Sequence, residues 1–316
     1  MLRSSFLYLS KLRWAQGVIT RVPLARAMAA RFVAGNTLAD ALAVTQRLNA
    51  RGLNVTLDFL GESVANAAEA AQAADEYVRA LEAIGSSTLR ANVSVKLTQL
   101  GLDLGHDVCL PNARRVVETA RAARTFVRVD MEGTPHTDRI VAMVRELRGE
   151  YDNVGVVLQA YLYRTEQDLL ALAAEQTRVR LCKGAYQEPP DKAFPRKRDV
   201  DANYLKLARL LLDHAAEAAP ADPAGRVPPL CALATHDERM IAGAQRHIAE
   251  QGISRQAFEF QMLYGIRAGL QEQLASAGYA VRVYVPYGSH WYPYFMRRLA
   301  ERPANVWFFA SSLARR

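Results

Sequence analysis

Eight short apolar runs recur along the chain, and helix-like stretches separate them. Each run has the length of a strand, most are rich in β-branched or aromatic residues, and strands that alternate with helices are typical of a parallel sheet wrapped by helices. The runs occupy residues 53–60, 91–97, 126–131, 154–160, 178–182, 229–235, 258–262 and 280–285. Because eight strands with crossover helices are the number that closes a barrel, we predict an α/β fold of the (β/α)8 TIM type.

An open, doubly wound sheet is the alternative arrangement of the same elements. The segments between the runs are rich in Ala, Leu, Glu and Arg, and helices are predicted at 66–84, 112–123, 137–149, 166–175 and 203–219. No G-x-G-x-x-G phosphate loop follows the first run, so the commonest functional signature of the open sheet is missing. The barrel is therefore favoured.

We expect a single catalytic domain over residues 1–316. The first strand begins only near residue 53, so residues 1–52 are expected to form additional N-terminal helices that brace or cap a barrel and closing helix at 53–316. Two segments rich in proline and charge, 187–200 and 219–229, are interpreted as surface loops, because a strand signal resumes after each.

Composition excludes several classes of protein. Half of the residues are hydrophobic and 23% are charged, which is typical of a globular protein and not of a disordered one. The net charge is +8, but the arginines are scattered, so nucleic acid is not an expected partner. Three distant cysteines, Cys109, Cys182 and Cys231, form no C-x-x-C pair and are expected to be buried thiols in a reducing compartment.

The expected location is cytoplasmic. No apolar run is long enough to cross a bilayer, and the first residues lack the apolar core and cleavage site of a secretory leader. Residues 1–31 mix Leu, Phe, Tyr, Val and Trp with Lys and Arg at loosely helical spacing. Core packing is the commoner use of such a segment, and a peripheral contact with the inner membrane stays open.

Polar side chains stand at the carboxyl ends of seven consecutive predicted strands. They are Lys96, Asp130, Gln159, Arg180 with Lys183, Thr235 with His236, Gln261 and Tyr284. In a barrel these ends meet at one mouth, where active sites form. Because an unpaired buried polar group costs on the order of 1–3 kcal/mol, the pattern indicates a site rather than chance.

Two adjacent arginines, Arg297 and Arg298, lie on the last predicted helix with Glu301 one turn beyond Arg297. Two planar guanidinium groups suit the binding of a carboxylate, and Glu301 is placed to orient one of them. An exposed basic end of a helix has the same spacing. The residues alone leave both interpretations open.

Several single residues have competing interpretations. Lys96 and Asp130 could form an ion pair on neighbouring strands, or Lys96 could be a Schiff-base nucleophile, although a nearby carboxylate opposes the lowered pKa which that role needs. His236 beside Asp237 lacks the spaced ligand set of a metal site, so no metal is predicted. Cys182 lies in an apolar strand, where packing is commoner than an activated thiolate.

Seven ordered motifs resemble the proline dehydrogenase family from the first strand to the last helix. They are VSVKLTQLG from Val93, VRVDMEG from Val127, VVLQAY from Val156, VRLCKGAY from Val179, ATHD from Ala234, FEFQMLYG from Phe258, and VRVYVPYG from Val281 followed by the FMRRLAE helix. The resemblance implies a distorted (β/α)8 barrel that holds FAD noncovalently. It also implies that the final helix lies over the barrel mouth and contacts the substrate.

The resemblance also implies a role for each residue. Asp130 and Arg180 are expected to be catalytic, with Arg180 beside flavin N5. The expected FAD contacts are Met131, Gln159, Arg180, Lys183, Gly184, Ala185, Thr235, His236 and Gln261. The expected substrate contacts are Lys96, Leu263, Tyr284, Arg297, Arg298 and Glu301, with the two arginines as a carboxylate clamp. The small residues Gly184 and Ala185 suit close approach to a planar cofactor.

The implied reaction is hydride transfer from L-proline to FAD, giving Δ1-pyrroline-5-carboxylate. A membrane quinone is the implied acceptor of the electrons. The chain has no region that resembles the aldehyde dehydrogenase or DNA-binding parts of bifunctional relatives, so a separate pyrroline-5-carboxylate dehydrogenase is the expected partner for the next oxidation. Proline and hydroxyproline are not distinguished.

Two positions depart from the family pattern. Cys182 stands where valine is common, which changes volume little, and Gln187 stands where many members carry an aromatic residue, which leaves a stacking contact there open. Two other functions stay as alternatives: a Schiff-base lyase or aldolase using Lys96 or Lys183, and a non-catalytic basic scaffold that binds membrane or nucleic acid.

Overall fold

Eight parallel strands form a closed barrel in the computed structural model, which describes residues 23–61, 64–216 and 222–301. The strands are β1 (Asn54–Phe59), β2 (Ala91–Val95), β3 (Val127–Val129), β4 (Val154–Gln159), β5 (Val179–Cys182), β6 (Cys231–Ala234), β7 (Phe258–Leu263) and β8 (Ala280–Tyr287). Strand β1 pairs in parallel with β8, from Asn54 opposite Arg282 to Phe59 opposite Tyr287, and this pairing closes the barrel. The predicted fold is confirmed.

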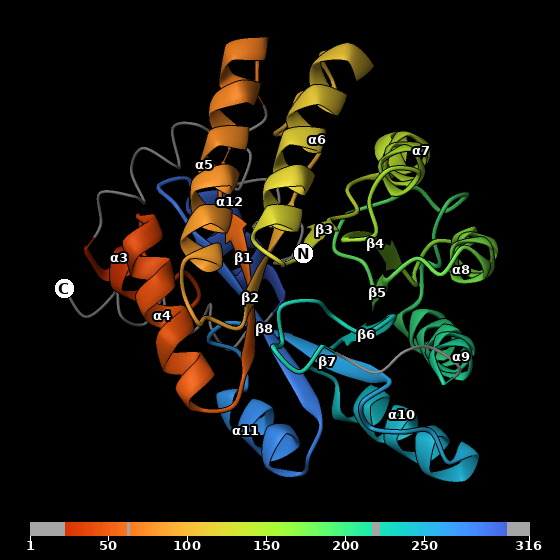
Figure 1. The fold of residues 1–316 in the computed structure, drawn as a ribbon. Helices are drawn as coiled ribbons and strands as arrows, with labels where there is room; N and C mark the ends of the chain where they lie inside the picture. Colours follow the sequence, from red (N-terminus) through yellow and green to blue (C-terminus); the bar gives the residue numbers. More distant parts are fainter. Residues whose placement is uncertain (1–22, 62–63, 217–221, 302–316) are drawn as a thin grey trace.

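Helices follow the strands around the outside of the barrel (Figure 1). They are α5 (Ala67–Gly85), α6 (His106–Ala122), α7 (Thr137–Arg148), α8 (Thr165–Ala174), α9 (Lys197–Ala215), α10 (Glu238–Gln251) and α11 (Ala268–Ser276). Ahead of the barrel come α3 (Pro23–Ala29) and α4 (Leu38–Ala50), and α12 (Tyr292–Glu301) follows β8. The predicted N-terminal helices are present within 23–52, whereas residues 1–22 lie outside the described part of the chain.

Helix α4 takes the outer position that α12 leaves vacant. It packs against β1 and β8, with Ala41, Val44 and Leu48 in the core. Its first turn is held by a capping box in which Thr37 accepts from the backbone of Asp40 and the Asp40 side chain accepts from the Thr37 backbone. Helix α12 is thereby free to lie at the carboxyl end of the barrel, which is the distortion that the sequence resemblance implied.

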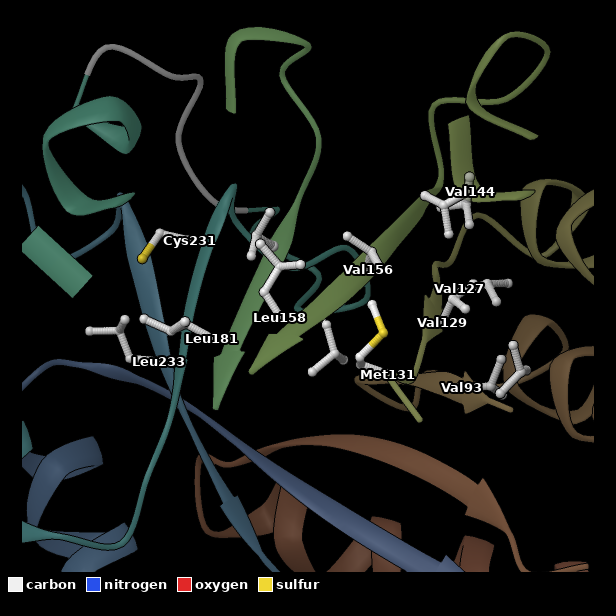
Figure 2. Close-up of a cluster of buried hydrophobic side chains, with 14 of the residues drawn as sticks. Val93, Val127, Val129, Met131, Val144, Val156, Leu158, Leu181, Cys231 and Leu233 are labelled. Atoms are coloured by element: carbon white, nitrogen blue, oxygen red, sulfur yellow. The ribbon is translucent and has the colours of Figure 1, made fainter. Parts of the chain in front are cut away.

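The outward faces of the strands form the hydrophobic core with the helices. Figure 2 shows apolar side chains from neighbouring strands: Val93, Val127, Val129, Val156, Leu158, Leu181 and Leu233. Val144 of α7 reaches the same cluster from outside. Burial of this outward face accounts for the apolar residues at alternate positions of most strands, because successive side chains of a strand point to opposite faces.

The inside of the barrel is polar and charged, whereas a barrel of this type is usually filled with branched apolar residues. Buried inward-facing groups include Asp58, Ser94, Arg128, Arg180, Glu259, Gln261 and Arg282. Opposite charges are paired in part: Arg282 Nε lies 2.8 Å from a carboxylate oxygen of Glu259. So many charges inside one barrel are typical of a functional site rather than of a packed core.

We predicted a surface loop at 219–229, and its described part is a loop that is exposed at 223–224 but packs against the barrel from Gly225 onward. Arg226 donates from Nε to the carbonyl of Leu89 at 3.0 Å and from Nη1 to that of Ala123 at 3.2 Å. The Gly225 carbonyl accepts from Arg282 inside the barrel at 3.0 Å. This segment closes the amino-terminal end of the barrel, because its arginine satisfies loop carbonyls that lack helix or strand partners.

Two predicted helix boundaries were wrong. Helix α6 begins at His106 rather than residue 112 and contains Pro111, where the Asn112 side chain donates to the Leu100 and Val108 carbonyls at 3.2 and 3.1 Å. Helix α9 begins at Lys197 and ends at Ala215, so the predicted loop 187–200 ends in a helix. For α9, proline and charge predicted a loop over residues that form the first turn of the helix.

Cys109 and Cys231 are buried and Cys182 is half-buried, and all three are free thiols, as predicted. Among the described residues, no helix has the length and hydrophobicity to span a bilayer.

Candidate active site

A cavity of about 1090 Å³ opens at the carboxyl ends of the strands. It brings together nearly all of the predicted site residues: Lys96, Asp130, Met131, Gln159, Arg180, Lys183, Gly184, Ala185, Thr235, His236, Gln261, Leu263, Tyr284, Arg297 and Arg298. The exception is Glu301, the last residue of α12, whose side chain lies outside the described structure. The predicted strand-end pattern therefore corresponds to one physical cavity.

A cluster of alternating charge lies at the centre of the mouth. Lys96 Nζ is 2.7 Å from Asp58 Oδ1 and 3.4 Å from Asp130 Oδ2, so the ion pair with Asp130 that we considered is present, and Asp58 is the nearer partner. The Tyr284 hydroxyl donates to Asp130 Oδ2 at 2.7 Å, and Ser94 Oγ donates to Asp130 Oδ1 at 2.7 Å. Asp130 thus accepts from several donors at once.

These contacts set the charge states of the cluster. Burial by itself would lower the pKa of Lys96, but the carboxylates of Asp58 and Asp130 raise its pKa above the ordinary value. Burial would raise the pKa of Asp130, but Lys96 and Arg180 keep that pKa below its usual value. The pKa of Asp58 is raised by burial, against the opposing effect of Lys96. Lys96 is therefore a stable ammonium, which argues against a Schiff-base nucleophile.

Arg180 is held between two strands beside this cluster. Its Nη1 donates to Asp130 Oδ1 at 2.9 Å and to Ser94 Oγ at 3.2 Å, and its Nε donates to Gln261 Oε1. The guanidinium lies over the Tyr284 ring, 5.3 Å from its centre. Only 5% of the residue is exposed, so the group is fixed in direction as well as buried.

A second charged group lies on the β5 and β6 side of the cavity. Lys183 Nζ is 2.6 Å from Asp201 Oδ1 and 2.9 Å from Asp237 Oδ2. Arg239 contacts both carboxylates, at 3.1 and 3.5 Å. Burial would raise the pKa of Asp237, but Lys183 and Arg239 lower its pKa below the usual range. Lys183 is consequently ion-paired twice, which does not suit a nucleophile either.

The cavity has the features that a planar, polar cofactor needs. Gly184 has φ +114°, and a Cβ atom there would lie 2.4 Å from the Tyr161 ring, so only glycine fits this turn. Arg180 Nη2 and Gln159 Oε1 are buried without a partner among the described residues. Since a buried orphan donor and acceptor call for a ligand or water, these residues fit an FAD ring system with polar edges.

The remaining predicted contacts have structural partners as well. His236 Nε2 accepts from the Leu263 backbone N–H at 2.8 Å, which fixes the ring beside β7. Thr235 Oγ1 accepts from the Asp237 backbone at 3.1 Å. Met131 lies in the hydrophobic cluster of Figure 2 and also reaches the cavity. No group of three or more potential metal ligands occurs within the described ranges.

Helix α12 places the paired arginines over the mouth. Phe295 and Met296 pack with Met28, Phe32 and other apolar residues in a separate hydrophobic cluster that joins α12 to α3. With that face of α12 buried, Arg297 and Arg298 are turned to the cavity that Arg180 and Gly184 also line. Arg298 is 8% exposed and its guanidinium lies 5.1 Å from the centre of the Tyr294 ring. The exposed-helix-end interpretation is therefore wrong.

Sequence reasoning missed several residues of the cavity. Asp58 lies next to the end of the first strand and so carries the same signal as the residues that were predicted. Tyr186 follows the Gly-Ala of the β5 motif and lines the mouth beside Arg297. Asp201 comes from α9, within a region whose fold we predicted incorrectly, and no sequence signal marked it.

A cavity at the mouth of a barrel, lined by two adjacent arginines and by buried polar groups without a partner among the described residues, fits an oxidoreductase that binds a cofactor and a small charged substrate. The sequence profile of the family described as Proline dehydrogenase matches residues 41–311. This chain belongs to the proline dehydrogenase family.

Individual relatives support the same family. The chain is 40% identical to Proline dehydrogenase 1 of Bacillus subtilis (strain 168), over 100% of both chains. It is 41% identical to a proline dehydrogenase of Deinococcus radiodurans, over 90% of both. The crystal structure of proline utilization A from Bdellovibrio bacteriovorus, inactivated by N-propargylglycine, superposes with a TM-score of 0.77 at 26% identity, over 87% of this chain and 32% of that one.

The function follows from family and fold together. This chain is an FAD-dependent oxidoreductase that oxidises L-proline. Neither an aldolase nor a non-catalytic basic scaffold is supported.

Proposed function

We propose that L-proline is oxidised to Δ1-pyrroline-5-carboxylate in the cavity at the barrel mouth, with its carboxylate bound by Arg297, Arg298 and Lys96. The observation that carries this proposal is the convergence of three cationic side chains on one cavity, two from α12 and one from the residue that follows β2. Guanidinium groups bind a carboxylate in a defined direction, so the ring of the amino acid would point toward Arg180 and Tyr284. Glu301 is proposed to orient Arg297, and Leu263 to contact the ring.

FAD is proposed to contact Met131, Gln159, Arg180, Lys183, Gly184, Ala185, Thr235, His236 and Gln261. When bound, it accepts the hydride that leaves the ring carbon of proline next to nitrogen. Arg180 supports this role because its charge is fixed, and a cation beside the ring favours the reduced, more negative cofactor. Lys183, paired with Asp201 and Asp237, would meet a more anionic part of the cofactor.

Asp130 is proposed to stabilise the ring nitrogen as positive charge develops on it. Its lowered pKa keeps the carboxylate ionised, and Ser94, Tyr284 and Arg180 hold both oxygens in place. A fixed anion close to a forming iminium lowers the barrier without reorganising.

The electron acceptor and the next enzyme are proposed on chemical grounds. A quinone is suited to reoxidise a flavin, and the net charge of +8 favours a peripheral contact with an anionic membrane surface. The imine product requires a further oxidation by a separate pyrroline-5-carboxylate dehydrogenase. We further propose that residues 1–316 act as a single catalytic domain.

Anaerobic titration with L-proline tests the proposed function. The pure protein is expected to be yellow and to lose its flavin absorbance when L-proline is added without oxygen. Reoxidation by a soluble quinone should restore the colour. Flavin-loaded protein that stays oxidised in excess L-proline would contradict the substrate assignment, and Asp130→Asn should slow the bleaching while retaining FAD.

A further inference from the structure

A hydrogen-bonded column of four side chains runs down the inside of the barrel from the cavity. We define the barrel column as Arg180, Gln261, Glu259 and Arg282. Arg180 Nε donates to Gln261 Oε1, and Gln261 Nε2 donates to Glu259 Oε1. Arg282 Nε donates to the same oxygen of Glu259 at 2.8 Å. The column therefore connects Arg180 to two residues that do not line the cavity.

The direction of the Gln261 amide depends on Glu259. The two ends of an amide group have nearly the same shape, and only its partners decide which end is the acceptor. A carboxylate that accepts from Arg282 can only accept from Gln261 as well, so the NH2 end of Gln261 faces Glu259 and its carbonyl faces Arg180. In this way Glu259 provides Arg180 with an acceptor in the required position.

Glu259 also supplies negative charge in a region that is otherwise cationic. Arg128 is 1% exposed, and its Nε and Nη2 have no partner among the residues that the structure describes. Burial and the neighbouring Arg180 lower the pKa of Arg128, while Glu259 opposes that change. Glu259 and Arg282 are each 1% exposed, so water screens these charges little.

We propose that Glu259 is a positioning residue for proline oxidation: through Gln261 it holds Arg180 in place, and its charge lowers the positive potential that Arg180 presents to the flavin. The inference rests on the proposed placement of Arg180 beside the flavin. Glu259 acts at a distance and touches neither substrate nor cofactor. Its role is to set how readily the bound flavin is reduced.

The reduction potential of the bound FAD in the holoenzyme tests this proposal. Glu259→Gln keeps an oxygen for both Gln261 and Arg282 but removes the negative charge. The reduced flavin should then be favoured, and at a fixed redox poise the ratio of reduced to oxidised flavin should rise about threefold or more, which is about 14 mV for a two-electron couple.

A variant that exchanges the two side chains should shift the reduction potential in the opposite direction. In Glu259→Gln combined with Gln261→Glu, residue 259 can accept from Arg282 and donate to residue 261, so the hydrogen bonds and the net charge are kept. The negative charge moves one step toward Arg180, and the ratio of reduced to oxidised flavin should fall below that of the wild type by about threefold. This variant keeps the net charge of the barrel interior. Its reduction potential therefore tests the proposal if Glu259→Gln does not retain FAD.

Two controls separate the possible failures. Glu272→Gln removes a carboxylate on α11 that is ion-paired with Arg51 at the surface, and it should leave the potential unchanged. Arg180→Lys should shift the potential if Arg180 adjoins the flavin. An unchanged potential in Arg180→Lys overturns the proposed placement of Arg180. The role of Glu259 alone is overturned if Arg180→Lys shifts the potential but both Glu259 variants keep the wild-type potential. It is also overturned if both Glu259 variants shift the potential in the same direction.

Discussion

Arginine has three different roles in this barrel, and its surroundings decide which. Arg180 is buried and bonded to Asp130, Ser94 and Gln261, so it is a fixed charge. Arg297 is half-buried and lines the opening of the cavity, where a substrate would reach it first. Arg226, at the opposite end of the barrel, has only carbonyl partners and serves stability.

Arg297→Met should weaken proline binding much more than FAD retention. The substitution keeps most of the apolar stem but removes the guanidinium, and loss of a charged hydrogen bond to the substrate typically costs about 1.5–3 kcal/mol, or about 10- to 150-fold in affinity. Anaerobic titration with L-proline gives the binding constant, and the flavin-to-protein absorbance ratio gives FAD retention. Equal losses of both would move Arg297 into the cofactor site.

Asp237→Asn should reveal the pH dependence of the ion pairs around Lys183. The pKa of Asp237 is lower in the folded protein than in the unfolded chain, so its contribution to stability is complete above about pH 4 and is lost as the pH falls toward the folded pKa. The melting temperature of the variant should lie below that of the wild type at pH 7. The difference in melting temperature should narrow below pH 4. A difference that does not depend on pH would contradict the lowered pKa of Asp237.

At the scale of elements, α12 and α4 divide the role of one barrel helix. A regular eighth helix would pack on the outside against β8 and β1, and α4 occupies that position. Helix α12 instead buries Phe295 against Phe32 and covers the cavity. The chain ahead of the barrel thus contributes to the site indirectly, by holding the helix that carries the paired arginines.

Phe32→Leu should reduce proline affinity through α12. The shorter side chain leaves part of the contact with Phe295 unfilled and should lower the free energy of unfolding by about 1–2 kcal/mol. Because α12 is held mainly by this cluster, KM for proline should rise several-fold. Val44→Ala, at the 2% exposed interface of α4, should cost similar stability with an unchanged KM. A similar KM in both variants would show that α12 is held elsewhere.

At the scale of the whole molecule, the two ends of the barrel are specialised. The carboxyl end carries the cavity, and the amino-terminal end is closed by the Arg226 segment. The charged interior connects the two ends, since Arg282 bonds Glu259 on one side and the Gly225 carbonyl on the other. Barrel folds commonly separate function from stability in this way.

Arg226→Met should destabilise the protein and leave catalysis intact. It removes the donors to the carbonyls of Leu89, Ala123 and Ile84, which should lower the free energy of unfolding by about 2–4 kcal/mol. Denaturant unfolding measures that loss, and steady-state assays at a temperature where the variant is folded measure kcat and KM. A large change in KM would show that the closed end is coupled to the mouth.

The amino-acid sequence by itself determined the eight strands, the crossover helices and most of the cavity. Local order carries this information: the apolar runs mark the strands, and residues such as Gln159 and Lys183 stand at their ends. Since parallel strands bring their carboxyl ends to one edge, position along the chain is enough to bring these side chains together. The paired arginines were visible as a motif, but their direction was not.

Tertiary structure alone decided the partners. It paired Lys96 with Asp58, turned Arg297 and Arg298 to the cavity by burying the other face of α12, and closed the barrel with Arg226. These contacts join residues far apart in the chain, and their energies depend on distance and burial, which no local pattern contains. For that reason the members of the site could be read from the sequence, whereas their charge states and directions required the fold.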